Sequence, residues 1–202
     1  MRKLSFAVVA SLLLAMPAYG YVEFDSGEYE PVDYSIGDTI SIDDNVPNNP
    51  GTHIELLPYG HIQGAVYSYN KARFTLNGGS VYGRLMMHDD SVASIKAGSL
   101  AYSDGKIFFM YENSLATIYG SSFSVNGTPV ACGESLRDYA VYNGTFYTGE
   151  LDGTLLDGTG ISGDFFIYSN ADITVVPEPV TSTLLISAML GLSGLALVRR
   201  RR

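Results

Sequence analysis

The side chains of this sequence that are best suited to chemistry are carboxylates. Asp89 and Asp90 stand in one segment and Glu112 in a related one, so a repetitive fold would bring all three to one flank. Two carboxyl groups beside one glycosidic bond can act as general acid and general base on a polysaccharide. Asp90 also aligns with Asn113 and Asn170, however, and residues of these types form turns without any catalytic role, because they tolerate a left-handed backbone there. Since residues 21–176 hold no obvious cluster of Lys and Arg to neutralise an acidic sugar, we expect no catalytic residues and no enzyme activity.

Other kinds of reactive site have little support in the sequence. His53, His61 and His88 lack a second His or Cys at the spacing of zinc ligands, so we expect no metal and no cofactor. The sequence contains no nucleophile elbow and no glycine-rich phosphate loop. Cys132 is the only cysteine, which excludes an internal disulfide, and we expect it to be a small buried residue.

The charge of the chain limits its partners. Residues 21–176 hold six Lys and Arg against twenty Asp and Glu, a net charge of −14. Such a surface repels the phosphate backbone of nucleic acid, so we expect no nucleic-acid partner. Eight of the acids fall between Glu23 and Asp44, so we interpret residues 21–50 as a solvated acidic leader.

The elements between residues 51 and 176 are expected to be strands. Apolar residues alternate with polar ones, as in Arg73-Phe74-Thr75-Leu76, and glycines or Asn/Asp clusters interrupt the pattern at short intervals. No stretch here has a helical period. The composition and pattern predict a repeat-containing, all-β domain over 51–176.

Internal repeats narrow the fold class further. The segments 85–95 (LMMHDDSVASI) and 108–118 (FFMYENSLATI) are identical at Met, Ser, Ala and Ile. Residues 165–175 (FFIYSNADITV) form a third copy and residues 66–76 (VYSYNKARFTL) a looser one, so that successive copies begin 19, 23 and 57 residues apart. A repeat of about 20 residues with two or three short strands fits one coil of a β-solenoid.

The solenoid hypothesis makes definite predictions. The same alternation occurs in Thr39-Ile40-Ser41-Ile42, and residues from about 35 to 175 should form stacked β-coils. Ala93, Ile95, Ala116 and Ile118 should face inward, and Ile95 and Ile118 should lie in adjacent parallel strands. Tyr and Phe at equivalent positions should form short ladders. The alternative is a β-sandwich, in which Asp89-Asp90-Ser91 turns a hairpin.

These units resemble the right-handed β-helix repeats of secreted, adhesin-like bacterial proteins. The resemblance covers roughly residues 55–120 and implies a right-handed β-solenoid. Residues 121–164 depart from it, because their many glycines suggest loops and irregular coils.

The N-terminus reads as a targeting segment. Arg2 and Lys3 precede an apolar run from Leu4 to Met16 that is too short to span a bilayer. Ala18 and Gly20 are the small residues that a signal peptidase requires, so we interpret residues 1–20 as a signal peptide cleaved after Gly20.

The C-terminus has the composition of a membrane anchor. Residues 180–198 form a stretch of 19 residues without charge, long enough for one transmembrane helix. The four arginines that follow should stop transfer and stay in the cytoplasm: Arg199, Arg200, Arg201 and Arg202. Pro177-Glu178-Pro179 precedes the stretch as a stiff, extended stub.

The order of triplet, apolar helix and arginine cluster resembles the PEP-CTERM sorting signal, here residues 177–202. That resemblance implies processing by an exosortase, a membrane-embedded enzyme of bacteria that export extracellular polysaccharide. Val180-Thr181-Ser182-Thr183 departs from the Ser or Ala that usually follows the triplet. An ordinary single-pass tail anchor is the alternative.

Two function classes follow. The first is an exported protein that begins as a membrane-anchored precursor in the inner membrane and ends at the cell surface or in a biofilm matrix, with a structural or adhesive role toward extracellular polysaccharide. The second is a small β-helix carbohydrate-active enzyme that uses a carboxylate pair. A carboxylate cluster in a concave groove would favour the second class.

Overall fold

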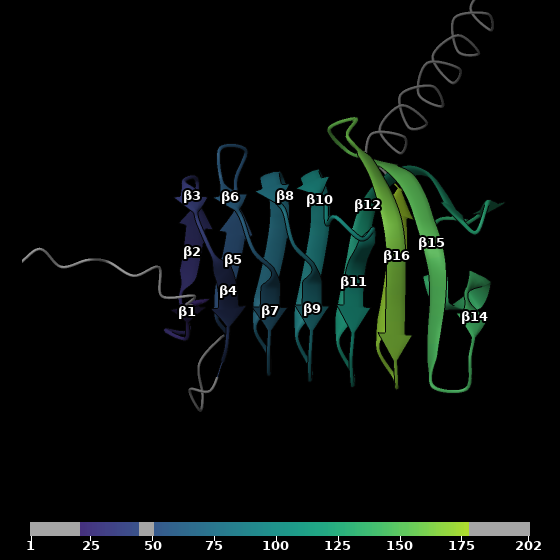
Figure 1. Ribbon diagram of the computed structural model, residues 1–202, viewed down its shortest axis with the longest axis horizontal. Helices are drawn as coiled ribbons and strands as arrows, with labels where there is room; N and C mark the ends of the chain where they lie inside the picture. Colours follow the sequence, from purple (N-terminus) through teal and green to yellow (C-terminus); the bar gives the residue numbers. More distant parts are fainter. Residues whose placement is uncertain (1–20, 45–50, 178–202) are drawn as a thin grey trace, which may run out of the picture.

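The structure is a computed structural model that describes residues 21–44 and 51–177 of the 202-residue chain. It is an all-β solenoid of about 4 turns, whose coils lie side by side along the long axis (Figure 1). Apart from the 3-10 turn η1 (Leu136–Tyr139), the described residues form strands and their connections. The predicted solenoid is therefore confirmed.

Three parallel sheets run along the stack. The strands of the first sheet are β1 (Tyr21–Phe24), β4 (Thr39–Ile42), β7 (Val66–Ser68), β9 (Leu85–Met87), β11 (Lys106–Met110) and β16 (Gly160–Tyr168). Those of the second are β2 (Tyr29–Val32), β5 (His53–Leu56), β8 (Arg73–Val81), β10 (Val92–Leu100), β12 (Leu115–Val125) and β17 (Asp172–Pro177). The third comprises β3 (Ser35–Ile36), β6 (His61–Ile62) and the last residues of β8 and β10.

The register between coils matches the sequence repeats. Ile95 of β10 lies opposite Ile118 of β12 in parallel strands, as predicted. In the first sheet, Leu85 lies opposite Val66 on one side and Phe108 on the other, and Phe108 lies opposite Phe165. The spacings of 19, 23 and 57 residues are therefore the lengths of chain between stacked positions.

The β-sandwich alternative is wrong for this chain. The strands on either side of Asp89-Asp90-Ser91, β9 and β10, do not pair with each other. Strand β9 pairs with β7 and β11, and β10 pairs with β8 and β12, in each case in parallel. The turn is a corner between two sheets of one coil.

The core fills the inside of the coils. Ala93, Ile95 and Ile118 are fully buried and Ala116 is 2 % exposed, which confirms their inward orientation. Stacked inner positions carry large apolar side chains, among them Phe74, Phe108 and Phe165. Burial of these side chains against those of the neighbouring coils supplies the main stabilising free energy of the fold.

The acidic segment is part of the stack and is not a solvated leader. Strands β1 and β4 belong to the first sheet, β2 and β3 to the other two, and Val32, Ile40 and Ile42 are fully buried. The alternation in Thr39-Ile40-Ser41-Ile42 directs the isoleucines inward, while the acids of residues 21–44 keep at least partial contact with solvent. The body begins at Tyr21 among the described residues, not at residue 51.

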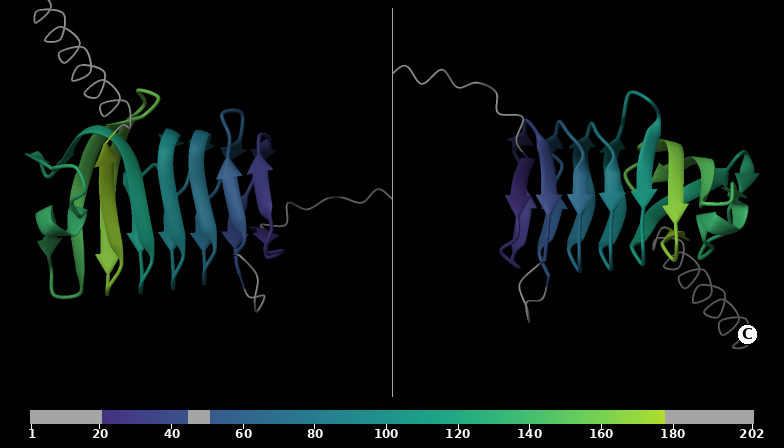
Figure 2. Two further views of the ribbon diagram at one scale, coloured as in Figure 1. Left: turned by 180° about the vertical axis from the view of Figure 1, so that it is seen from behind. Right: turned by 60° about the horizontal axis from the view of Figure 1, so that its bottom comes forward.

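The glycine-rich part of the chain is also more regular than expected. Strands β15 (Phe146–Leu155) and β16 form a long antiparallel hairpin, and β13 (Thr128–Pro129), η1 and β14 (Val141–Tyr142) lie at the same end of the stack (Figure 2). Gly158 at the hairpin turn has a φ of 84°, which an L-residue adopts only with strain. A Cβ on Gly153 would lie 2.1 Å from the ring of Phe123, so this glycine lets a remote aromatic residue pack on the strand.

Candidate functional site

The outer face of the first sheet carries a continuous set of aromatic side chains. Tyr69, His88 and Tyr111 directly follow strands β7, β9 and β11, and Tyr168 is the last residue of β16, so that one lies in each successive coil. We call these four residues the aromatic ladder. Their ring centroids are 5.0, 4.4 and 4.7 Å apart, and the planes lie 17°, 5° and 14° from parallel. The expected ladders are confirmed, with a histidine as one of the rungs.

A second outward row runs beside the ladder. The register places Tyr67, Met86, Phe109 and Phe166 opposite one another, and Phe109 stacks on Phe166 at 4.8 Å. All of these side chains are partly exposed. The guanidinium of Arg84 lies 5.3 Å from the Phe109 ring and also pairs with Asp104, so the face is apolar in its middle and charged at its margin.

The ladder stops at the coil that contains β4. There, Ser41 occupies the position of Tyr67, and Asp43 follows β4 as Tyr69 follows β7. These smaller side chains leave a groove of about 540 Å³, open to solvent. Its lining comprises Tyr21, Glu23, Thr39, Ser41, Asp43, Tyr67 and Tyr69. We call it the terminal groove.

The groove combines aromatic walls with carboxylates. The ring planes of Tyr67 and Tyr69 are 7° from parallel, and since His88 covers one face of Tyr69, the other face borders the groove. Asp43 is held in place by Asn70, whose amide donates to its Oδ1. Burial, together with the nearby Tyr67 hydroxyl and the Asp43 carboxylate, raises the pKa of Tyr69.

The carboxylates that sequence reasoning singled out lie elsewhere, at the corners between the first and second sheets. The backbone N–H of Asp89 donates to Glu112 Oε2 at 3.2 Å, so these two residues do come together. The side chain of Asp89 accepts from the N–H of Asn70 at 3.1 Å, and that of Asp90 accepts from the Asn113 amide at 3.1 Å. All three acids are exposed, and they bond neighbouring coils to each other.

The corner turns explain this bonding. Asn70, Asp89, Glu112 and Ser169 have φ between 53° and 57°, so the left-handed residue is the one before Asp90, Asn113 and Asn170. Asn170 donates to Asn113 Oδ1 at 3.3 Å, which continues the chain of side-chain bonds along the stack. The turns therefore lie where the sequence predicted them. The residue with left-handed backbone, however, is the one before the predicted residue in each turn.

The remaining predicted residues are dispersed. His53 lies on the second sheet and His61 on the third, whereas His88 belongs to the aromatic ladder. Cys132 is exposed and not buried as expected, because it lies in the connection between β13 and η1. Among residues 21–44 and 51–177, no three His, Cys, Asp or Glu side chains gather into a group that could hold a metal ion.

The targeting segments fall largely outside the described residues. This applies to Ala18, Gly20, Glu178, Pro179 and the terminal arginines. Pro177 is the last residue of β17, where it lies opposite Gly120, so its backbone is extended as expected. No helix in the described part of the chain has the length and apolarity needed to cross a bilayer.

Comparison with known proteins identified no relative of this chain. No protein-family model matches the chain, and neither the curated proteins nor the solved structures give a significant match. The features of the molecule that bear on function are therefore its sequence signals and two parts of its outer surface, the aromatic ladder and the terminal groove.

Proposed function

We propose that this protein is an exported bacterial surface or biofilm-matrix protein that is sorted by an exosortase and has a structural or adhesive role toward polysaccharide. The observation that carries the adhesive part is the aromatic ladder with its terminal groove. Aromatic rings, hydroxyls and carboxylates on a rigid, open face are the groups that contact sugars without reacting with them.

The sorting part of the proposal is supported by the two ends of the sequence. Residues 1–20 have the order of a signal peptide, and residues 177–202 have the order of a PEP-CTERM signal. Signal peptidase, the exosortase and the inner membrane are then successive partners. The resemblance to adhesin-like repeats also supports right-handed winding of the solenoid.

The proposed role is not catalytic. Asp89, Asp90 and Glu112 are the acids that an enzyme mechanism would use, but each is exposed at a corner turn and makes a hydrogen bond between coils. A general acid for glycoside cleavage instead needs a site that raises its pKa. We therefore assign these acids to the structure of the solenoid.

Sorting can be tested in a bacterium that carries an exosortase. The Glu178→Ala variant should accumulate in the inner-membrane fraction, while the unmodified protein reaches the cell surface and becomes sensitive to protease added to intact cells. Glu150→Ala, which changes an exposed acid of the body, is the matched control and should be sorted normally. Normal surface delivery of the Glu178→Ala variant would contradict the proposal.

A further inference from the structure

The terminal groove is about as wide as one aromatic ring that would continue the ladder. Neighbouring strands are roughly 4.8 Å apart, so the rings of Tyr67 and Tyr69 stand about two spacings from the side chains of β1. The ladder shows that one ring occupies one spacing, because its centroids are 4.4–5.0 Å apart. With only Ser41 and Asp43 between them, these walls accommodate a single ring of the ligand.

The lining suits a sugar ring better than a flat aromatic ring. One face of a pyranose is made of C–H groups, which pack well on an aromatic ring, and the groove offers the nearly parallel rings of Tyr67 and Tyr69. Its rim carries hydroxyls, and Thr39 and Ser41 present hydroxyls on the floor of the groove. The groove is open to solvent, so a sugar within a longer chain can enter it.

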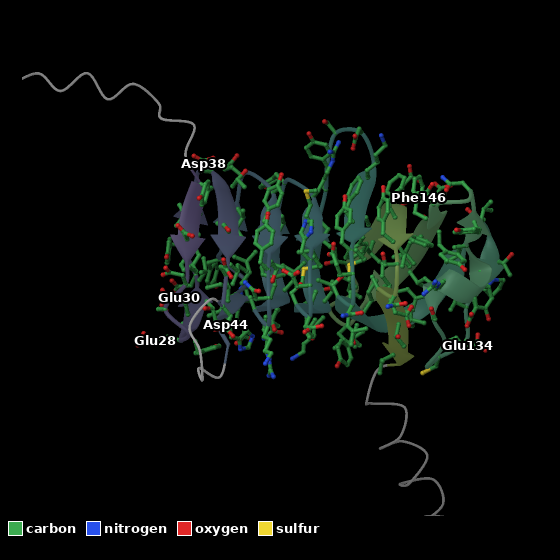
Figure 3. All side chains as sticks on the ribbon, turned by 90° about the horizontal axis from the view of Figure 1, so that it is seen from below. Glu28, Glu30, Asp38, Asp44, Glu134 and Phe146 are labelled. Carbon is green, nitrogen blue, oxygen red and sulfur yellow. The ribbon has the colours of Figure 1, made fainter. Side chains whose placement is uncertain are left out.

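The charge around the groove selects among sugars. Residues 21–70 contain nine Asp and Glu and no Lys or Arg, and Glu23 and Asp43 line the groove itself. The labelled acids Glu28, Glu30, Asp38 and Asp44 gather at the same end of the solenoid, opposite the end that carries Phe146 (Figure 3). This potential attracts a cation and repels a uronic acid.

We propose that the terminal groove binds a protonated amino sugar of a polysaccharide, with its ring against Tyr67 and Tyr69 and its ammonium group at Glu23 and Asp43. The ammonium group would make charge-assisted hydrogen bonds and lie beside the tyrosine rings. This inference rests on the proposed function, since it names the sugar class that the adhesive face contacts.

Calorimetry tests the inference with defined sugars. The full chain, solubilised in a mild non-ionic detergent, is titrated at pH 6 with a β-1,4-linked glucosamine hexamer and with its N-acetylated counterpart. Because acetylation removes the charge and keeps the ring, we expect the glucosamine hexamer to bind at least about tenfold more tightly.

Variants locate the binding. The double variant Glu23→Gln/Asp43→Asn keeps the shape of the groove and should weaken binding about tenfold or more, as should Tyr69→Leu. Tyr59→Leu removes an exposed tyrosine that belongs neither to the ladder nor to the groove, and Asp152→Asn removes an exposed acid of β15. These two controls should bind the hexamer as the unmodified protein does.

Three results would overturn the inference. They are equal binding of the acetylated hexamer, unchanged binding by the groove variants, and competition by hexa-arginine as strong as that of the glucosamine hexamer. The first two would leave polysaccharide contact in place at another part of the face, so they do not contradict the proposed function. Failure of sorting in cells would contradict the proposed function without changing these affinities.

Discussion

His88 stacks on Tyr111 with ring centroids 4.4 Å apart and planes 5° from parallel, and Tyr69 covers the other face of the imidazole. The three residues come from three successive coils. The ladder therefore ties together segments of the chain that contact one another only because the coils are stacked.

Removal of the central rung should weaken the stack. His88→Ala deletes two ring contacts worth about 0.5–1.5 kcal/mol each, so we expect the free energy of unfolding to fall by about 1–3 kcal/mol. Urea denaturation followed by circular dichroism measures this change. Tyr59→Ala is the control, since Tyr59 is 80 % exposed, and an equal loss in both variants would contradict a structural role for the ladder.

Because neighbouring coils approach closely at Gly83, a larger residue there should destabilise the fold. A Cβ on Gly83 would lie 2.4 Å from the backbone of Gly64, whereas one on Gly37 would meet nothing within 4 Å. Gly83→Ala should therefore lower the free energy of unfolding by about 1–3 kcal/mol through overpacking, and Gly37→Ala should change it by less than about 1 kcal/mol. Thermal unfolding of the two variants tests the difference, and equal midpoints would refute the coil spacing.

The acidic end should keep the solenoid from stacking on itself. In the stack that contains Ile54, Phe74 and Ala93, Glu30 occupies the equivalent position of the first coil, and among the described strands β2 pairs only with β5. A charge placed inward on an edge strand opposes edge-to-edge pairing. Glu30→Leu should thus promote association through this end, seen as a larger mass in analytical ultracentrifugation. Glu150→Leu is the control, and a monomeric Glu30→Leu variant would show that other features protect the edge.

Stability should fall in mild acid partly because of His53. Burial is the main cause that lowers the pKa of His53 below 6.5. The nearby charge of Glu55 raises this pKa, and that of Arg73 lowers it. As the pH falls, His53 is protonated at a higher pH in the unfolded chain than in the folded chain. The free energy of unfolding therefore decreases as the pH falls below about 6.5. His53→Gln should lose less stability between pH 7.5 and 5.5 than the unmodified protein. An equal loss would mean that His53 does not contribute.

The repeats made most of the fold predictable. Ile95 and Ile118 could be placed opposite each other because alternation fixed the buried face and the repeat spacing fixed the register. The alternation at Ile40 and Ile42 was visible in the sequence and placed coils from about residue 35, but the high density of acids led residues 21–50 to be assigned to a solvated leader. In the glycine-rich part, Gly153 is required by Phe123, a contact between segments that no local pattern reveals.

The terminal groove was harder to predict than the ladder. Tyr69 and Tyr111 stand at equivalent places in visible repeats, but the groove depends on what replaces them in the preceding coil. That coil is longer, since Ile40 pairs with Val66 across 26 residues, so Asp43 could not be aligned with Tyr69 from the repeat spacing alone. The small residues that form the groove therefore gave no signal in the sequence.

The most direct test of the account is the intact mass of the exported protein, recovered from a bacterium that carries an exosortase. If an exosortase sorts the protein, the mature mass should correspond to loss of residues 1–20 and of the tail that follows Pro177-Glu178-Pro179. In a variant with these three residues changed to alanine, only the N-terminal loss should occur. Identical masses and equal rates of maturation for the two proteins would contradict exosortase sorting.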